Sequence, residues 1–183
     1  ALLVESSDVL LERLEQTRLD FLVARLFERH DKRHLHYQAL ADEEICAIAR
    51  PGHPILALGR PDLAELARGS WIVPPEGSVL RHRFELMFRG AGLQPPRQVL
   101  ATTELMFMTK MLQESDYMEV VAVDVARHYD EHGMVKIVPV ELSCNMDSFG
   151  IITRTDWLLS PGARIVLQAL QATAAEIYGA PPA

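Results

Sequence analysis

The sequence predicts an α/β fold of two lobes, with mainly parallel sheets and a cleft between the lobes. Apolar runs of strand length alternate with segments of helical period along the chain, a pattern that is typical of βα units. Two similar blocks, each a capped helix followed by an apolar strand, are separated by a Pro- and Gly-rich region at residues 50–61. Such folds bind ligands where strand ends and helix N-termini converge. The pattern therefore favours a binding protein.

The N-terminal block is expected to begin with the end of a strand at residues 2–5. Ser6, Ser7 and Asp8 then offer capping oxygens to a helix that carries apolar residues on one side. The other elements expected in this half are a strand at 19–24, two strands within residues 35–49 of which the later is 45–49, a short helix at 62–67 and a strand at 71–73.

The clearest helix of the chain follows Ser78. Its apolar positions recur at helical spacing from Leu80 through Phe84 and Phe88, and Gly92 ends it. The elements expected after it are a strand at 98–101, a helix at 104–112 capped by Thr103, a strand at 118–123, a helix from Asp124 to Gly133, strands at 135–142 and 149–153, and a last helix from Ser160-Pro161.

The composition excludes several functional classes. The 183 residues are 49% hydrophobic and 23% charged, which is ordinary for a globular protein. The net charge of −7 disfavours nucleic-acid binding, because a surface that binds nucleic acid needs positive charge to neutralise the phosphates. No apolar run approaches the ~20 residues needed to cross a bilayer. Cys46 and Cys144 lack partners at metal spacing. We expect a cytoplasmic protein with reduced thiols, no membrane span and no signal peptide.

Hydroxyl residues stand at three helix starts, namely Ser6-Ser7, Gly77-Ser78 and Thr102-Thr103. A helix N-terminus presents unpaired N–H groups and the positive end of its dipole, so hydroxyls there can hold a carboxylate, phosphate or sugar hydroxyl. The alternative is ordinary capping. Arg25 follows an apolar strand and either faces a ligand or forms an exposed salt bridge.

The sequence displays no catalytic or metal-binding motif. His30, His34 and His36 are close together, but Lys32 and Arg33 lie among them and oppose a cation. The pair at 128 and 132 lacks the HExxH pattern, and no nucleophile elbow, Walker A loop or complete G-x-G-x-x-G occurs. We expect no enzymatic activity, no metal and no cofactor.

A series of motifs in a fixed order resembles the effector-binding domain of LysR-type transcriptional regulators. The matching segments are Glu5-Ser6-Ser7, Leu19-Asp20, Ala24-Arg25-Leu26, Ala49-Arg50-Pro51-Gly52-His53-Pro54, Trp71-Ile72-Val73-Pro74-Pro75, Gly92-Leu93-Gln94-Pro95-Pro96, Leu112-Gln113-Glu114-Ser115-Asp116, Phe149-Gly150-Ile151-Ile152-Thr153-Arg154 and Leu159-Ser160-Pro161-Gly162-Ala163. The resemblance covers nearly all of residues 2–178. Ser115-Asp116, where many members carry Gly-x-Gly, is most similar to the subgroup named for the galactose-binding-protein regulator.

The resemblance implies a two-lobed type 2 periplasmic-binding-protein fold. Residues 1–70 and 150–183 would form one lobe, and residues 71–149 the other. A small effector, a sugar or an organic acid, would bind between them. The positions that match the family's effector contacts are Ser6, Ser7, Arg25, Ser78, Val79, Thr102, Thr103 and Phe149.

The resemblance also implies partners. Members of the family form homodimers or homotetramers and bind promoter DNA through a helix-turn-helix domain that is not among these residues. The first strand and helix of the effector domain are not matched either, which puts the completeness of the site in doubt.

Two other functions remain open from the sequence. A solute-binding protein of a transport system has the same architecture but requires export. A small enzyme would use the cleft with His53 or His128 as its base. A pair of titratable groups that converge in the cleft would distinguish the enzyme.

Overall fold

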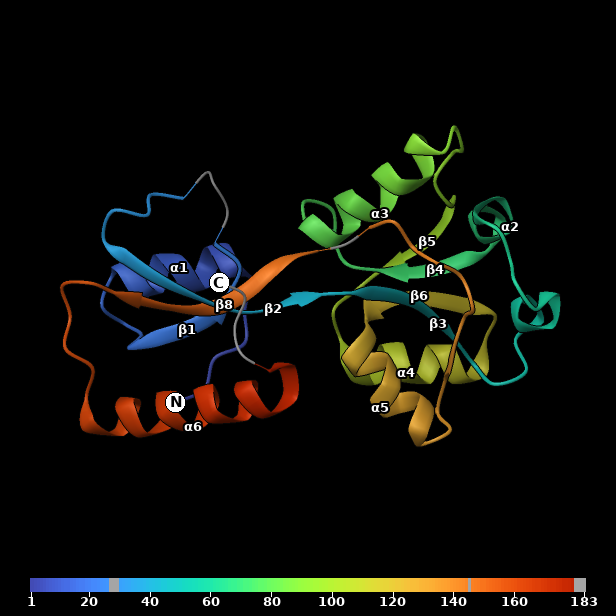
Figure 1. Ribbon diagram of the computed structural model, residues 1–183. Coiled ribbons are helices and arrows are strands. Elements are labelled where there is room, and N and C mark those ends of the chain that lie inside the picture. The colour runs from blue at the N-terminus through green and yellow to red at the C-terminus, as the bar shows by residue number, and fades with distance from the viewer. Residues whose placement is uncertain (27–29, 145, 180–183) are drawn as a thin grey trace. The chain divides into compact units, whose positions relative to one another are not determined.

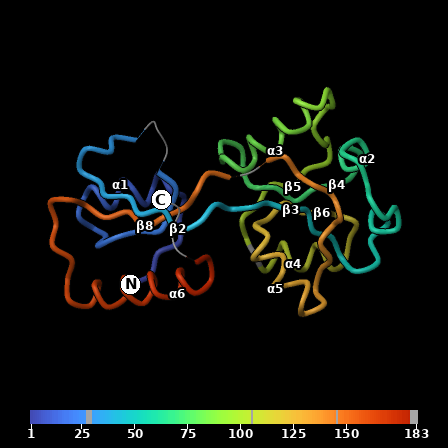
Figure 2. The backbone as a smooth tube through the Cα atoms, in the orientation of Figure 1, coloured from blue at the N-terminus to red at the C-terminus, as the bar shows by residue number. Residues whose placement is uncertain are grey.

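The computed structural model describes residues 1–26, 30–144 and 146–179, which form two compact units (Figures 1 and 2). Unit 1 consists of Ala1–Asp42 and Asp147–Ala183, and unit 2 of Glu43–Met146. Each unit has its own sheet and its own apolar core. None of the helices in the described part of the chain is long and apolar enough to cross a membrane.

Unit 1 is a three-stranded sheet with a helix on each face. The strand order is β1-β8-β2. Leu10 and Leu14 of one helix pack on Ile152, whereas Ala174 of the other packs on Ile151. Because successive side chains of a strand point to opposite faces, the two helices cover opposite faces of the sheet (Figure 1). The elements are α1 (Ser7–Glu15), β1 (Phe21–Ala24), β2 (Leu35–Glu43), β8 (Met146–Arg154) and α6 (Pro161–Tyr178).

Unit 2 is a five-stranded sheet in the order β5-β4-β6-β3-β7. Phe84 and Phe88 of α3 pack on Trp71 on one face, and Leu112 of α4 packs near Ile72 on the other. The elements are β3 (Ile45–Ala49), η1 (Pro54–Leu58), α2 (Leu63–Arg68), β4 (Ser70–Val73), α3 (Val79–Gly90), β5 (Gln98–Ala101), α4 (Leu105–Glu114), β6 (Tyr117–Ala122), α5 (Val123–Glu131) and β7 (Lys136–Ile137).

Trp71 is the centre of the larger core of unit 2. Its side chain is fully buried, and its ring centroid lies 4.8 Å from that of Phe84. The indole N–H donates a hydrogen bond to the carbonyl of Leu66 at 2.9 Å. Burying an aromatic side chain of this size contributes several kcal/mol, and the hydrogen bond removes the cost of burying its polar group. The residue therefore fixes both α2 and α3 against β4.

The structure differs from the sequence expectations in three respects. The sheet of unit 2 is mixed, because β4 is parallel to β5 and β6 while β3 is antiparallel to β6 and β7, and in unit 1 β1 is antiparallel to β8. The parallel pairs are those that the crossover helices α3 and α4 connect. Residues 43–70 lie in unit 2 rather than with residues 1–42, because β3 pairs with β6. Residues 2–5 form no strand.

Gly150 provides a test of the sheet in unit 1. A Cβ at this position would overlap the carbonyl oxygen of Gln38 and the ring of Tyr37 on β2. We expect Gly150→Ala to lower the free energy of unfolding by about 1–3 kcal/mol, measured by urea denaturation. Gly162→Ala is the matched control, since a Cβ there meets nothing within 4 Å. Equal stability of the two variants would contradict the described packing of β8 on β2.

Candidate functional site

The carboxyl ends of three strands meet at one edge of the sheet in unit 2. Parallel β4 and β5 end in register at Val73 and Ala101, and the backbone N–H of Thr102 donates to the carbonyl of Val73 at 3.1 Å. Strand β6 is also parallel to β4, so it ends at the same edge, at Ala122. Helix α5 begins directly after β6, and short loops lead from β4 to α3 and from β5 to α4. Three helix N-termini therefore share this edge, which we call the N-terminal edge of unit 2.

The three helices differ in how their first turns are capped. The Ser78 hydroxyl accepts a hydrogen bond from the backbone N–H of Arg81 at 3.2 Å and caps α3. Helix α4 begins after Glu104 and α5 after Ala122, and neither residue makes a side-chain cap. The first N–H groups of a helix have no partner within it. The N–H of Val123, the first of α5, donates to the carbonyl of Glu44 at 2.9 Å. The N–H groups after it, those at the start of α4 and the positive ends of both dipoles can therefore meet an acceptor group.

The connections of the sheet change direction at this edge. From β4 the chain crosses through α3 to β5 on one side, and from β5 it crosses through α4 to β6 on the other side of β4. Helices α3 and α4 consequently cover opposite faces of the sheet, as Figure 1 shows. Open α/β sheets bind ligands outside the carboxyl ends of the strands where the strand order reverses in this way.

The structure brings the four expected site residues of unit 2 to the N-terminal edge. Ser78 and Val79 start α3, and Thr102 and Thr103 follow β5. The Thr102 hydroxyl accepts from the N–H of Glu104 at 3.1 Å, whereas Thr103 is exposed. This bond is made to Glu104, the residue before α4, and not to the first turn of the helix, so the prediction that Thr103 caps α4 is wrong.

The four expected site residues of unit 1 also lie together. Helix α1 packs on β1 and reaches it through a short loop, so the two run in opposite directions. Ser6 and Ser7 at the start of α1 therefore lie at the same end as Arg25, which follows β1. Ala24 pairs with Gly150, which places Phe149 next to Arg25. The Nε of Arg25 donates to the carbonyl of Asp147 at 3.1 Å.

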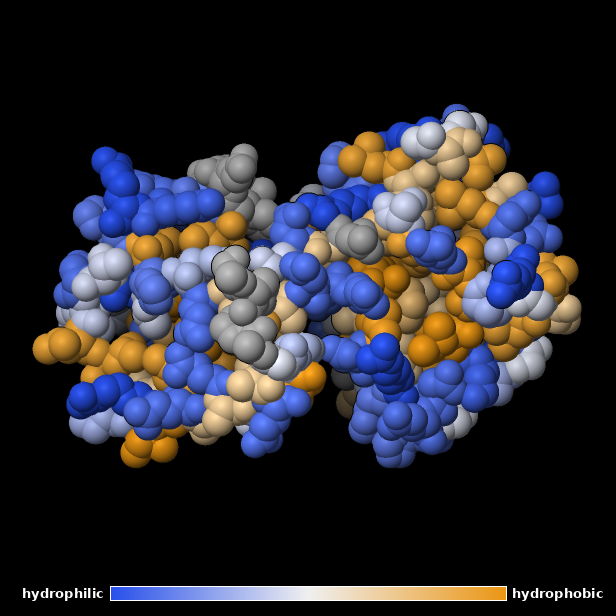
Figure 3. Space-filling view, in the orientation of Figure 1, coloured by the Kyte–Doolittle hydropathy of each residue, from blue (hydrophilic) through white to orange (hydrophobic). Residues whose placement is uncertain are grey.

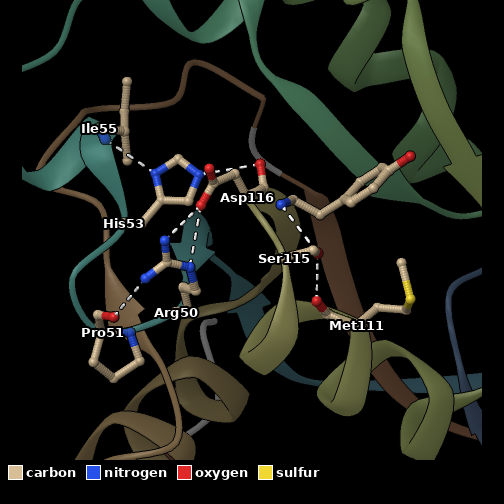
Figure 4. A network of polar contacts seen from close by, with 8 residues as sticks. Arg50, Pro51, His53, Ile55, Met111, Ser115 and Asp116 are labelled. Atoms are coloured by element: carbon tan, nitrogen blue, oxygen red, sulfur yellow. Dashed lines mark hydrogen bonds and ion pairs between the residues drawn. The ribbon is translucent and has the colours of Figure 1, made fainter.

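The opposite edge of unit 2 holds a network of polar contacts, drawn in Figure 4. Two nitrogens of Arg50 donate to one carboxylate oxygen of Asp116, at 3.1 Å and 2.7 Å. The Nδ1 of His53 accepts from the N–H of Ile55 at 3.0 Å, and its Nε2 lies 3.1 Å from the carbonyl of Asp116. The network joins the turn after β3 to the start of β6. Its contacts within the protein give it a structural role.

The contacts of His53 in this network disfavour its expected alternative role as a catalytic base. Its ring is buried and both nitrogens are engaged with backbone groups, so it has no lone pair to offer a substrate. His128 is exposed on α5, where its ring lies 4.5 Å from that of His132. No group of three metal-ligating side chains occurs within residues 1–26, 30–144 and 146–179.

The two cysteines are buried and unpaired. Burial raises the pKa of both thiols to about 11, so they are protonated at neutral pH. Thiolate chemistry is therefore not favoured at either position.

The grooves of the surface lie elsewhere. One of about 820 Å³ in unit 1 is lined mainly by apolar residues, including Leu3, Phe21 and Val166. One of about 600 Å³ in unit 2 lies along α3 and includes Leu86 and Cys144. None of the expected site residues lines either groove. Figure 3 shows that hydrophobic side chains reach the surface of both units among charged ones.

The N-terminus of α5 was not among the expected site features. The sequence carries no capping residue there, because an apolar strand runs directly into the helix at Ala122-Val123. The parallel pairing of β6 with β4 places the N-terminus of α5 at the same edge as those of α3 and α4.

The roles of the two histidines can be separated by substitution. We expect His53→Ala to lower the free energy of unfolding by about 1–3 kcal/mol, because the N–H of Ile55 loses its acceptor inside the protein. His128→Ala should change it by less than about 0.5 kcal/mol, since the side chain is exposed. Urea denaturation of the wild type and both variants measures these changes in the free energy of unfolding. A His53 variant as stable as the wild type would contradict the structural role.

Comparison with known proteins assigns the chain to a family. Residues 1–175 match the model of the LysR substrate-binding domain. The chain is 40% identical over 173 residues to the HTH-type transcriptional regulator GbpR of Azospirillum brasilense, covering 94% of the chain and 51% of that protein. The chain therefore spans about half the length of this relative.

Solved structures show the same fold. The regulatory domain of CcmR from Synechocystis PCC6803, in complex with 2-PG, has a TM-score of 0.76 and 17% identity, with 97% of this chain and 84% of that chain covered. The effector-binding domain of QuiR in complex with shikimate has a TM-score of 0.71 and 15% identity, with 95% and 80% covered. These neighbours confirm the expected two-lobed type 2 periplasmic-binding-protein fold. The chain belongs to the LysR substrate-binding domain family.

Proposed function

We propose that the chain senses a small metabolite on behalf of a transcription regulator and leaves the metabolite chemically unchanged. The observation that carries this proposal is the convergence of three helix N-termini at the N-terminal edge of unit 2. Such an edge can hold polar acceptor groups through backbone N–H donors. The candidate bases do not support catalysis, because His53 is engaged with backbone groups and His128 is exposed on α5. The family assignment also favours a regulator over an enzyme or a transport protein.

The chemistry of both residue sets favours a hydroxylated sugar or organic acid as the effector. Ser6, Ser7, Thr102 and Thr103 supply hydroxyl groups that donate to and accept from ligand hydroxyls. Arg25 and the helix dipoles supply positive charge for a carboxylate or phosphate. The neighbours solved with 2-PG and shikimate carry such ligands.

Apolar side chains complete the proposed site. Val79 starts α3 beside Ser78, and Phe149 lies next to Arg25 on β8. Apolar contacts of this kind exclude water and strengthen the polar contacts beside them.

A ligand that binds one arrangement of the two units better than another shifts their equilibrium by its difference in affinity. In the whole regulator this shift would be passed to promoter DNA. DNA binding would then reside in a helix-turn-helix domain outside these residues, in a cytoplasmic homodimer or homotetramer.

A binding experiment tests the site. Thermal-shift screening against hexoses and hydroxylated acids such as shikimate identifies a ligand, because a compound that binds the folded form raises the Tm. Calorimetry then compares the wild type with Ser7→Phe and Thr103→Phe. We expect each variant to weaken binding by about tenfold or more, since a bulky ring at a helix start blocks access to the N–H groups.

Thr173→Phe is the matched control, because Thr173 is exposed on α6 and belongs to neither residue set. It should bind the ligand like the wild type. Unchanged affinity in both site variants, with their Tm values also unchanged, would refute the site assignment.

A further inference from the structure

Glu119 is a carboxylic acid inside the apolar core of unit 2. It lies in β6 with 4% of its surface exposed, and its register partners are Ile48 on β3 and Ile72 on β4. Its neighbours Met118 and Val120 belong to the core under α3. Because side chains alternate along a strand, Glu119 points to the other face, which α4 and α5 cover.

The cluster around Glu119 is apolar, and the charge that acts on it comes from its margin, where Arg127 of α5 is near enough to Cys46 to lower the pKa of that thiol. The titratable members of the apolar cluster on this face are Cys46, Tyr117 and Tyr129. Among the described residues no hydrogen bond to the Glu119 carboxyl occurs, and its 4% exposed surface leaves it only a narrow contact with solvent. The charged side chains of the covering helices pair at the surface instead, as Lys110 with Glu114, Arg127 with Asp124, and Asp130 with Lys136. The remaining titratable residues of α5, His128 and Glu131, are exposed.

An ionised carboxylate in such a place is costly. Burying a charge without a partner disfavours the charged form, whereas a neutral carboxylic acid among isoleucines costs much less. Burial raises the pKa of Glu119 from its ordinary value of 4.5 to about 7.

We propose that Glu119 is a proton-sensitive group that sets how tightly α4 and α5 pack on the sheet of unit 2. In its protonated form the carboxyl fits between Ile48 and Ile72, and the two helices close over it. On ionisation it seeks water, and the least disruptive route to water is to displace the helices that cover it.

The direction of the pH effect follows from the raised pKa. Between about pH 4.5 and 7 the folded chain holds a proton on Glu119 that the unfolded chain has released. The contribution of this group to stability therefore falls as pH rises through that window and stays low above it. Carboxylates in salt bridges act in the opposite direction, so the effect of Glu119 is isolated by comparing variants.

The effect reaches the effector site if the proposed function holds. Helices α4 and α5 begin at the N-terminal edge of unit 2, so looser packing would disturb the N–H groups that meet the ligand. This part rests on the proposed function, and we expect weaker ligand binding at pH 8 than at pH 6. Stability measured without ligand tests the role of Glu119 separately from it.

The experiment measures urea unfolding of the chain at pH 5 and pH 8. Glu119→Gln mimics the protonated group, Glu119→Leu removes its polarity, and Glu131→Gln is the control for an exposed glutamate on α5. We expect the equilibrium constant for unfolding of the wild type, relative to Glu119→Gln, to rise by about tenfold or more from pH 5 to pH 8. Glu119→Leu should behave like Glu119→Gln, and Glu131→Gln like the wild type.

Parallel pH profiles of the wild type and both Glu119 variants would overturn the proposal. If neither variant folds, carbon-13 NMR of the wild-type carboxyl decides. A titration midpoint well above 4.5 supports the proposal, and one near 4.5 overturns it.

Discussion

The parallel pairing of β4 with both β5 and β6 is the constraint on which the rest of unit 2 depends. Parallel neighbours need crossover connections, and here these are α3 and α4. Each crossover returns to the sheet in the same direction, so the strands end, and the helices begin, at one edge. The donors that we propose to hold a ligand are thus products of the sheet topology rather than of a particular polar side chain.

The remaining features hold that edge in place. Trp71 fixes α2 and α3 on β4, and the contacts of Arg50 and His53 with Asp116 fasten the far ends of β3 and β6. Polar groups are satisfied within the protein at the far edge, whereas the starts of α4 and α5 keep backbone donors without a side-chain cap. This contrast separates the structural cluster at the far edge from the proposed binding site.

Local chemistry made much of the fold predictable. The spacing of Phe84 and Phe88 predicted α3, and Ser78 and Ser160 cap their helices as expected. Features that depend on partners distant in the sequence could not be predicted. The strand expected at residues 2–5 does not form, because no strand of the sheet in unit 1 pairs with these residues. Strand β3 belongs to unit 2 because it pairs with β6, and Glu119 is buried because it pairs with Ile48 and Ile72 on the neighbouring strands. For the candidate site, the sequence indicated hydroxyl caps but not the uncapped start of α5.

The most direct test of the central claim is an amide NMR titration of the chain with a ligand found by screening. If backbone N–H groups at helix starts bind the effector, the largest shifts in unit 2 will fall in the first turns of α3, α4 and α5. Shifts concentrated instead around Arg50 and Asp116, at the far edge of the sheet, would contradict the account.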